Sequence, residues 1–380
     1  MERFRSFDAL VVGVMALLLA VILFVAAQNR PTAAASTQII FTRLDEQYHE
    51  QLFSLSLPLE ELDRVDSTVG IPIVDDNAVQ LSDGEASVWD FSVSSDRSQI
   101  AYSALNQEGG SDLWRSRGQG EAPEYLIACP NASCNSPAWS PDGRFLAFTR
   151  RSTDATSGGG GLTPPRLWLL NLESGETAQV FADNQILGFN PLWSASGQWL
   201  SYLSPELNGV SLYNLNDGQS RFFKTDTGEP GVWHPTEDKF LLSILSQVDD
   251  QYRIHLYLAD PSNDELINLS GDLAVEDTSA TWSPNGEQIS FRRKELEGAT
   301  ATLGKQLWIM DEDGTASQRL TLASDFDHGQ PTWSLDGKWL LYHRFPLRGP
   351  EIVFSIWLTD VNSGEHLEIV RSGQRPMWFQ

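Results

Sequence analysis

A tryptophan-containing turn sequence recurs along the chain and constrains the fold more than any other feature. The clearest copy is Trp139-Ser140-Pro141-Asp142-Gly143, and tryptophans of the same kind follow at intervals of about 40–54 residues. The other copies are at 193–197, 233–236, 282–286 and 333–337, with a worn copy at 93–96 and a terminal one at 376–378. Repeats of this period with strand-like content are typical of a β-propeller, in which each repeat forms one four-stranded blade. The sequence therefore predicts an all-β fold.

Each copy predicts the hairpin between the first two strands of a blade. Ser-Pro-Asp-Gly suits a type I turn, because proline presets φ at its second position and glycine is favoured at its last. Apolar triplets follow as second strands, and aliphatic–aromatic pairs such as Leu113-Trp114 and Leu307-Trp308 follow as third strands. The repeated tryptophan is interpreted as packing between blades, because a large ring at the same place in every repeat buries much area.

The two ends of the chain look like halves of one blade. Pro376-Met377-Trp378 resembles a first strand, and residues 38–43 resemble the second strand at 144–150. We therefore expect a seven-bladed β-propeller closed by N- and C-terminal strands, which leaves no open sheet edge. A six-bladed ring is the alternative, because residues 57–74 show no alternation and contain Pro58 and Pro72 where a fourth strand is needed.

These repeats resemble the WD-like repeat of the TolB-type (PD-type) β-propeller family. The same repeat occurs in the propellers of tricorn and dipeptidyl-peptidase-type enzymes. The pattern covers almost all of residues 38–380. The resemblance implies the fold and no particular binding residue, because the binding residues of the family do not form a short motif. The chain departs from TolB in its expected seven blades and in having no visible α/β domain before the propeller.

Residues 9–27 form an uncharged, apolar stretch near the N-terminus. About 20 such residues span a bilayer as a helix, whereas the apolar core of a signal peptide runs to about 7–15. A retained transmembrane helix is therefore favoured, although Ala33-Ala34-Ala35 leaves a cleaved signal open. Arg3 and Arg5 predict a cytoplasmic N-terminus. The expected single-pass membrane protein has a cytoplasmic tail at 1–8, an anchor at 9–27, a linker at 28–37 and a periplasmic or extracellular propeller at 38–380.

The net charge limits which binding partners are expected, and the cysteine content predicts how the two cysteines are used. The formal net charge of −25 argues against binding nucleic acid. The simpler interpretation of this negative charge is that it keeps the protein soluble. The more specific interpretation is that it attracts cations or basic partners. The two cysteines, Cys129 and Cys134, predict a disulfide in an extracytoplasmic domain. They make a poor zinc site, because no second ligand pair is visible.

The sequence shows no catalytic or cofactor-binding motif. A Gly-x-Ser-x-Gly nucleophile elbow, a phosphate-binding loop and a His-Glu-x-x-His helix are all missing from it. Residues 311–314 begin like a calcium loop, but Leu322 stands where the loop needs glutamate, so they are interpreted as a turn. We therefore predict no catalytic residue, no metal site and no cofactor.

Loop lengths indicate where a ligand would bind. The loops between second and third strands, at 106–110, 151–165, 294–304 and 345–351, are long and variable, as are the blade-to-blade connections at 272–277 and 325–330. Both sets emerge on one face of the ring, called the variable face here, and insertions gathered on one face mark a binding face. Near the channel mouth of that face we expect five candidate binding residues, Glu276, Asp277, Asp327, His328 and Arg375.

The sequence thus favours a membrane-tethered, extracytoplasmic binding or scaffold module for a protein or small-ligand partner that it does not identify. The alternative is a propeller hydrolase or lyase with catalytic groups on the variable-face loops, since fold does not settle function. Carboxylates clustered with His328 at the channel mouth would favour the enzyme. A mouth lined by Ser, Thr and apolar groups would favour the binding module.

Overall fold

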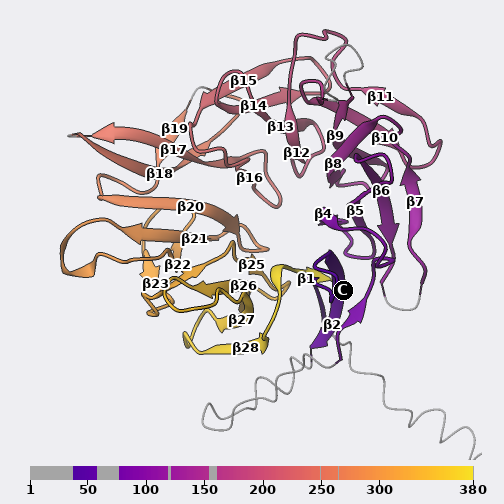
Figure 1. The fold of residues 1–380 in the computed structure, drawn as a ribbon. Helices are drawn as coiled ribbons and strands as arrows, with labels where there is room; N and C mark the ends of the chain where they lie inside the picture. Colours follow the sequence, from indigo (N-terminus) through magenta and orange to yellow (C-terminus); the bar gives the residue numbers. More distant parts are fainter. Residues whose placement is uncertain are drawn as a thin grey trace, which may run out of the picture. The chain divides into compact units, whose positions relative to one another are not determined.

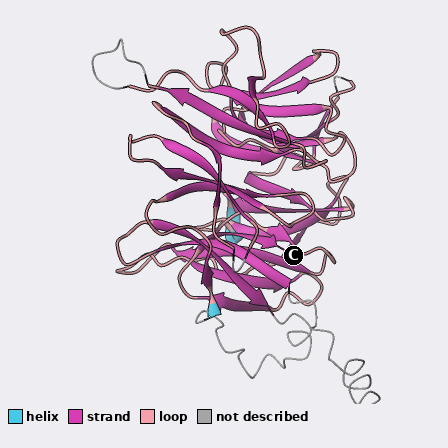
Figure 2. Cartoon of the chain, turned by 90° about the vertical axis from the view of Figure 1, so that its right-hand side faces the viewer, coloured by secondary structure: helices cyan, strands magenta, loops and turns pink. Residues whose placement is uncertain are grey.

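Strands make up nearly all of the regular structure in the part of the chain described (Figure 2). The computed structural model describes residues 37–57, 77–118, 121–153, 161–248, 250–263 and 265–379, all within one compact unit, Thr37–Gln380. Within these ranges the named helical element is a 3-10 turn, η2 (Gly298–Thr300). The predicted all-β fold is therefore confirmed.

Nearly all strands pair antiparallel, in groups that follow one another along the chain and around a common centre (Figure 1). In two places a single parallel pairing joins neighbouring groups into an eight-stranded sheet. The first groups are β29 (Gln374–Phe379), β1 (Thr37–Leu44), β2 (Glu50–Leu57) and β3 (Val79–Gln80); β4 (Val88–Val93), β5 (Ile100–Leu105), β6 (Ser111–Ser116) and β7 (Glu124–Ile127); β8 (Ala132–Trp139), β9 (Phe145–Ser152), β10 (Arg166–Asn171) and β11 (Thr177–Gln179); and β12 (Phe189–Trp193), β13 (Trp199–Ser204), β14 (Gly209–Asn214) and β15 (Ser220–Lys224).

The remaining groups repeat the same order of strands. They are β16 (Val232–Trp233), β17 (Phe240–Val248), β18 (Gln251–Ala259) and β19 (Leu266–Asn268); β20 (Val275–Trp282), β21 (Gln288–Glu295), β22 (Gln306–Asp311) and β23 (Gln318–Arg319); and β24 (Phe326–His328) and β25 (Thr332–Trp333), both paired with β26 (Trp339–Pro346), then β27 (Ser355–Asp360) and β28 (His366–Val370). Each predicted second and third strand lies in one of these groups, because alternating apolar residues and polar turns specify a hairpin locally.

The Ser-Pro-Asp-Gly turns are held by their own side chains. Ser140 Oγ donates to Asp142 Oδ1 at 2.6 Å and accepts from the Phe145 amide at 2.9 Å, while Gly143 takes a φ of 68°. Ser334 and Asp336 repeat the arrangement at 2.5 Å. Since every contact lies within a few residues, this part of the fold can form from local sequence alone.

Five of the repeated tryptophans join their group to the one before it, whereas Nε1 of Trp282 has no hydrogen-bond partner among the residues described. The indole Nε1 of Trp193 donates to the carbonyl of Ala138 at 3.1 Å, and that of Trp378 donates to Thr332 at 3.0 Å. Trp139, Trp233 and Trp333 make the same bond to Ser92, Leu192 and Thr281. The rings of Trp139, Trp233, Trp282, Trp333 and Trp378 are buried. These contacts agree with the packing interpretation.

Bulges in the innermost strands form a second set of ties between groups. Ser136, Asn190, Ser279 and Arg375 each lie three residues before a repeated tryptophan and have a φ between 51° and 52°. A bulge frees an amide from the strand ladder. The freed amide of Ser136 donates to Asp90 Oδ2 at 2.7 Å, and that of Ser279 donates to Glu229 Oε2 at 2.9 Å. Each bond reaches a side chain of the preceding group.

The two ends of the chain meet in one sheet. β1 lies between β29 and β2, with Ile39 opposite Trp378 and Ile40 opposite Met377. Trp378 belongs to a buried cluster with Ile39 and Leu341, whereas Phe379 packs into a cluster with Tyr102. The last residues of the chain therefore contribute to two cores.

The predicted localisation as a single-pass membrane protein is corrected by the structure. Among the residues described, no helix is long and apolar enough to cross a membrane. An apolar stretch makes a span only when its backbone forms a continuous helix, because lipid cannot satisfy free backbone groups. The predicted tail at 1–8 and anchor at 9–27 lie outside the described residues, as does the linker up to residue 36.

Candidate functional site

The five candidate residues predicted from the sequence lie on innermost strands of three groups. Glu276 and Asp277 are on β20, Asp327 and His328 are on β24, and Arg375 is on β29. Glu276 and Asp327 both act electrostatically on Lys305, whose pKa is lowered mainly by burial. The structure thus brings Glu276 and Asp327 near one lysine. His328 bonds to the backbone of the same lysine, whereas Asp277 and Arg375 have other partners.

Asp277 is buried inside the protein and fully paired. Its carboxylate is 0% exposed and accepts from Arg293 Nε at 2.7 Å, Arg293 Nη2 at 2.6 Å and Ser270 Oγ at 2.6 Å. The Arg293 guanidinium lies over the rings of Phe291 and Trp308, 5.0 and 4.9 Å from their centroids. A carboxylate with these partners and no exposed surface stabilises the fold and has no free oxygen for a ligand.

Asp327 and His328 are also engaged within the protein. Asp327 pairs with Arg292 and accepts from the Lys305 amide at 3.2 Å. His328 is 0% exposed, and its Nδ1 donates to the Lys305 carbonyl at 2.8 Å. Burial lowers the pKa of His328 to about 4. His328 is therefore a neutral, enclosed imidazole at physiological pH, which cannot contact a substrate without a rearrangement.

Arg375 ties the two ends of the described chain together. Its Nη2 lies 2.7 Å from Glu50 Oε1, its Nε donates to Thr42 Oγ1 at 3.3 Å, and its Nη1 donates to the carbonyl of Trp89. Its amide donates to His343 Nδ1 at 3.3 Å. The guanidinium is held by the protein, so Arg375 serves the contact between β29 and its neighbours.

Buried histidines make stability depend on pH. Burial lowers the pKa of His343 to about 4, as it does for His328, against about 6.5 in an unfolded chain. The unfolded state therefore binds more protons than the folded state between these values. We expect the free energy of unfolding to be at its full value above pH 6.5 and to fall as the pH drops toward 4, by up to about 1.4 kcal/mol per pH unit for each histidine.

Urea unfolding at several pH values between 7 and 4 tests this expectation. His343→Gln should give a shallower decline than the parent protein, because one proton-binding group is gone. An equal decline in parent and variant would show that His343 does not carry this dependence.

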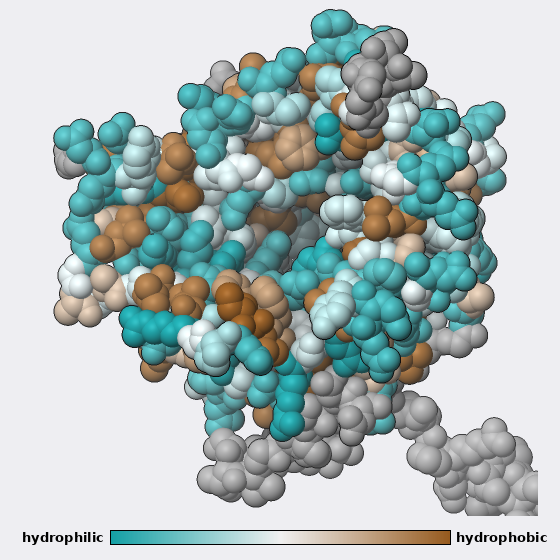
Figure 3. All heavy atoms as spheres, viewed as in Figure 1, coloured by the Kyte–Doolittle hydropathy of each residue, from teal (hydrophilic) through white to brown (hydrophobic). Residues whose placement is uncertain are grey.

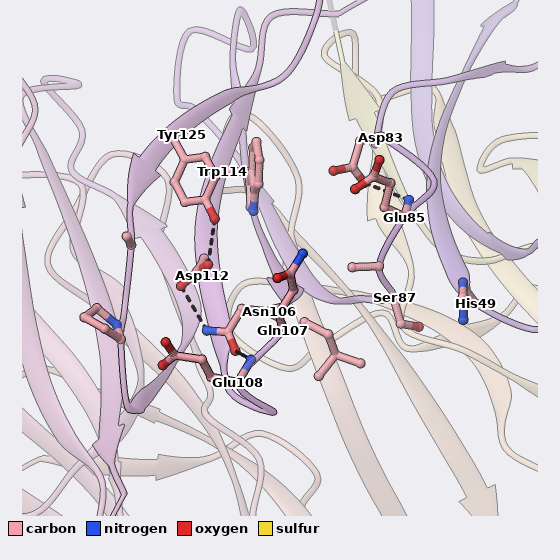
Figure 4. A pocket seen from close by; sticks show the side chains of 14 residues that line it. His49, Asp83, Glu85, Ser87, Asn106, Gln107, Glu108, Asp112, Trp114 and Tyr125 are labelled. Atoms are coloured by element: carbon pink, nitrogen blue, oxygen red, sulfur yellow. Dashed lines mark hydrogen bonds between the residues drawn. The ribbon is translucent and has the colours of Figure 1, made fainter.

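A pocket of about 640 Å³ opens between the β1–β3 and β4–β7 strands (Figure 4). One wall comes from the connection between β3 and β4 and includes Asp83 and Glu85. The other wall comes from the loop between β5 and β6 and from β6 and β7, and includes Trp114 and Tyr125. One of the loops predicted for the variable face, at 106–110, lines this pocket, and none of the five predicted channel residues does.

Aromatic rings form one wall of the pocket. Trp114 and Tyr125 lie with ring centroids 3.9 Å apart and planes inclined by 47°. Tyr125 Oη donates to Asp112 Oδ2 at 2.8 Å, and this bond is the main cause that raises the pKa of Tyr125 to about 12. Asp112 also accepts from Asn106 Nδ2 at 3.1 Å. These bonds hold the wall in one arrangement.

The disulfide braces the same wall. Cys129 and Cys134 are joined, and both are buried. The Cys129 amide donates to Asp112 Oδ1 at 2.7 Å, and the Asn131 amide donates to Glu108 Oε2 at 2.7 Å. Ala128 and Pro130, beside Cys129, line the pocket. The pair expected from cysteine count thus fixes a loop next to the pocket, although sequence reasoning did not connect the two.

Negative charge surrounds the pocket. Asp83, Glu85 and Glu108 are exposed at its edge, and Asp112 lies at its base. His49, a further lining residue, lies 3.8 Å from Asp45. Hydrophilic side chains also predominate on the face drawn in Figure 3, around a central hollow. Within the described ranges, no group of three or more His, Cys, Asp or Glu side chains is placed to hold a metal ion.

Three solved structures with a similar fold differ in what their names say they do. TolB from Acinetobacter baumannii shares 12% identity at a TM-score of 0.51, over 90% of this chain and 66% of that one. A puromycin-hydrolyzing peptidase from Mycobacterium tuberculosis shares 13% identity at a TM-score of 0.62, over 90% of this chain and 53% of the peptidase. An oligogalacturonate lyase from Vibrio parahaemolyticus shares 13% identity at a TM-score of 0.57, over 87% of this chain and 95% of the lyase. At these identities the likeness shows the fold alone.

A family model describes most of the chain. The model of the TolB β-propeller domain (PD40) matches residues 71–334. These residues carry the Trp-Ser-Pro-Asp-Gly repeats and the wall formed by Trp114 and Tyr125. The match agrees with the resemblance seen in the repeats, and the chain therefore belongs to the TolB β-propeller domain family.

Proposed function

We propose that this protein is a seven-bladed propeller that binds a segment of a partner protein in the pocket beside Trp114 and catalyses no reaction. The observation that carries the binding role is the pocket itself, about 640 Å³ in volume, with an aromatic wall and an acidic edge. Pockets with apolar walls and a few placed polar groups are the usual form of a ligand site.

The strand pairings support seven blades. The strands of the described ranges form five sheets, and each of the two eight-stranded sheets is counted as two blades, divided at its parallel pairing. In this count β29 with β1, β2 and β3 supplies the seventh blade. Trp378 Nε1 donates to Thr332 of the preceding group, while Phe379 packs with Tyr102 of the following one. The blade made from both chain ends thus contacts a neighbouring group on each side, as a closed ring requires.

The surroundings of His328 favour binding over catalysis. A general base must come within hydrogen-bond reach of the proton that it removes. His328 has no exposed surface, and its neighbour Asp327 is paired with Arg292. The peptidase and the lyase share the fold, and this chain covers only 53% of the peptidase. Neither His328 nor Asp327 is therefore placed, in the part of the chain that the structure describes, to perform the chemistry of the enzyme alternative.

A peptide array tests the proposal. The full chain, the Trp114→Leu variant and the matched Trp89→Leu variant, whose indole is 56% exposed outside the pocket lining, are each applied to immobilised random decapeptides. We expect a set of peptides that bind the parent and the Trp89 variant and lose binding to the Trp114 variant. Mass spectrometry of the peptides should show no cleavage. Peptide cleavage, or the absence of any Trp114-dependent peptide, would contradict the proposal.

A further inference from the structure

An arginine lies over the third-strand aromatic ring in several blades. Each of these arginines comes two residues after the aromatic residue of the second strand. Those aromatic residues are Phe41, Phe148, Phe291 and Tyr342. The distances from guanidinium carbon to ring centroid are 4.3 Å for Arg43 over Phe53, 5.0 Å for Arg150 over Trp168, 4.9 Å for Arg293 over Trp308 and 3.4 Å for Arg344 over Trp357. The ring at this position of the repeat is therefore a place where the fold seats a cation.

The β4–β7 blade has the ring and lacks the arginine. Ala104 comes two residues after Tyr102, and Trp114 is the third-strand ring. Ala104 stands opposite Asp112, as Arg293 stands opposite Gln306 in the β20–β23 blade. Residues directly opposite in an antiparallel pair share a face of the sheet. Ala104 therefore occupies the arginine position of its blade with a side chain too short to cover Trp114.

Two other blades also lack the arginine, and protein atoms fill the space in both. In the β12–β15 blade, Phe181 packs edge-on against Tyr213 at 4.9 Å. In the β16–β19 blade, Ile244 stands at the arginine position and belongs with Tyr257 to one apolar cluster. In the β4–β7 blade Ala104 is buried in an apolar cluster against which Trp114 packs, and Trp114 itself also lines the pocket. In Figure 4 Tyr125 stands on one side of Trp114, and Asp83 and Glu85 stand on the other side across the opening.

We infer that this pocket binds the guanidinium group of an arginine side chain on a partner protein segment, stacked on Trp114. The inference rests on the proposed binding function and names its ligand. A planar guanidinium stacks on an aromatic face and donates to carboxylates at its edge, which suits Trp114 together with Asp83 and Glu85. Their carboxylates are exposed at the pocket edge, so they can turn toward the cation. The partner's arginine takes the role that Arg43, Arg150, Arg293 and Arg344 have in their own blades.

Fluorescence anisotropy with short labelled peptides tests this inference on the full chain. The probes are acetyl-Gly-Ala-Arg-Ala-Gly and its citrulline and lysine counterparts, where citrulline keeps the shape of arginine without its charge. We expect the arginine peptide to bind about tenfold or more tightly than the citrulline peptide, and several-fold more tightly than the lysine peptide. Asp83→Asn combined with Glu85→Gln should weaken arginine binding and reduce its dependence on salt.

The Ala104→Arg variant gives the decisive comparison. It places the protein's own arginine over Trp114, as in the other blades, and should abolish binding of the arginine peptide. Leu335→Arg is the matched control, because it adds the same charge at an exposed turn residue and should leave binding unchanged. If Ala104→Arg fails to fold, the Trp114→Leu variant and the Asp83→Asn, Glu85→Gln double variant still test the inference. Both should lose the preference for the arginine peptide over the citrulline peptide.

Two results would overturn the inference. One is equal binding of the arginine peptide and either its citrulline or its lysine counterpart, and the other is undiminished binding to a folded Ala104→Arg variant. Failure here is distinguishable from failure of the proposed function. Trp114-dependent array peptides without arginine would leave the binding role in place and remove the arginine assignment, whereas an array with no Trp114-dependent peptide would remove both.

Discussion

Replacing Trp378 by alanine should lower the free energy of unfolding by about 3–5 kcal/mol, although Trp378 lies only two residues from the end of the chain. Terminal residues usually contribute little to stability. Here the ring is 4% exposed, packs with Ile39 and Leu341, and donates to the Thr332 carbonyl at 3.0 Å. Its removal leaves a cavity in a blade that is built from both ends of the chain.

Urea unfolding followed by circular dichroism measures the effect. Trp89→Ala is the matched control, because it removes the same side chain from a position that is 56% exposed, and it should change stability by no more than about 0.5 kcal/mol. Equal stability of the two variants would mean that β29 does not hold its blade together, and would count against ring closure through the termini.

Replacing Asp277 by alanine should cost about 3–5 kcal/mol, because it leaves the Arg293 guanidinium buried without its counter-charge. The pair is almost completely enclosed, with 4% of the arginine side chain and 0% of the aspartate side chain exposed, at a distance of 2.6 Å. Breaking one partner of such a pair is costly, whereas replacing both with apolar groups of similar volume is close to neutral.

The double variant Asp277→Leu with Arg293→Met should therefore recover most of the loss. Glu276→Ala is the control, because Glu276 is the residue before Asp277 and is only half-buried. This substitution should change the free energy of unfolding only slightly. Thermal and urea unfolding of the four proteins measure these differences. If the double variant is no more stable than Asp277→Ala, the loss comes from packing and not from the unpaired charge.

Residues with only local partners were predictable from the sequence. The turn at Ser140 and Asp142 is closed by bonds that span two to five residues, and the strands beside it alternate in a readable pattern. The pairing of β1 with β29 was also predictable, because each end carries a recognisable part of one repeat.

The candidate site depended on contacts between distant segments. Asp277, Asp327 and His328 were expected near a channel mouth. The structure shows that the two carboxylates pair with Arg293 and Arg292, and that Nδ1 of His328 bonds to the Lys305 carbonyl. A position in a repeat indicates the strand of a residue but not its partner across the sheet. One signal beside the pocket was present in the sequence, because Tyr102 is followed two residues later by Ala104 where four other repeats have arginine.

The sequence by itself determined the all-β repeat architecture and its turns, because these follow from short-range patterns repeated along the chain. Only the tertiary structure decided which carboxylates are buried in ion pairs, and which aromatic rings line a pocket. Those outcomes depend on neighbouring blades, such as the meeting of Asp83 with Trp114 across the pocket. Burial and pairing of a charge are properties of the folded surroundings, which no single repeat contains.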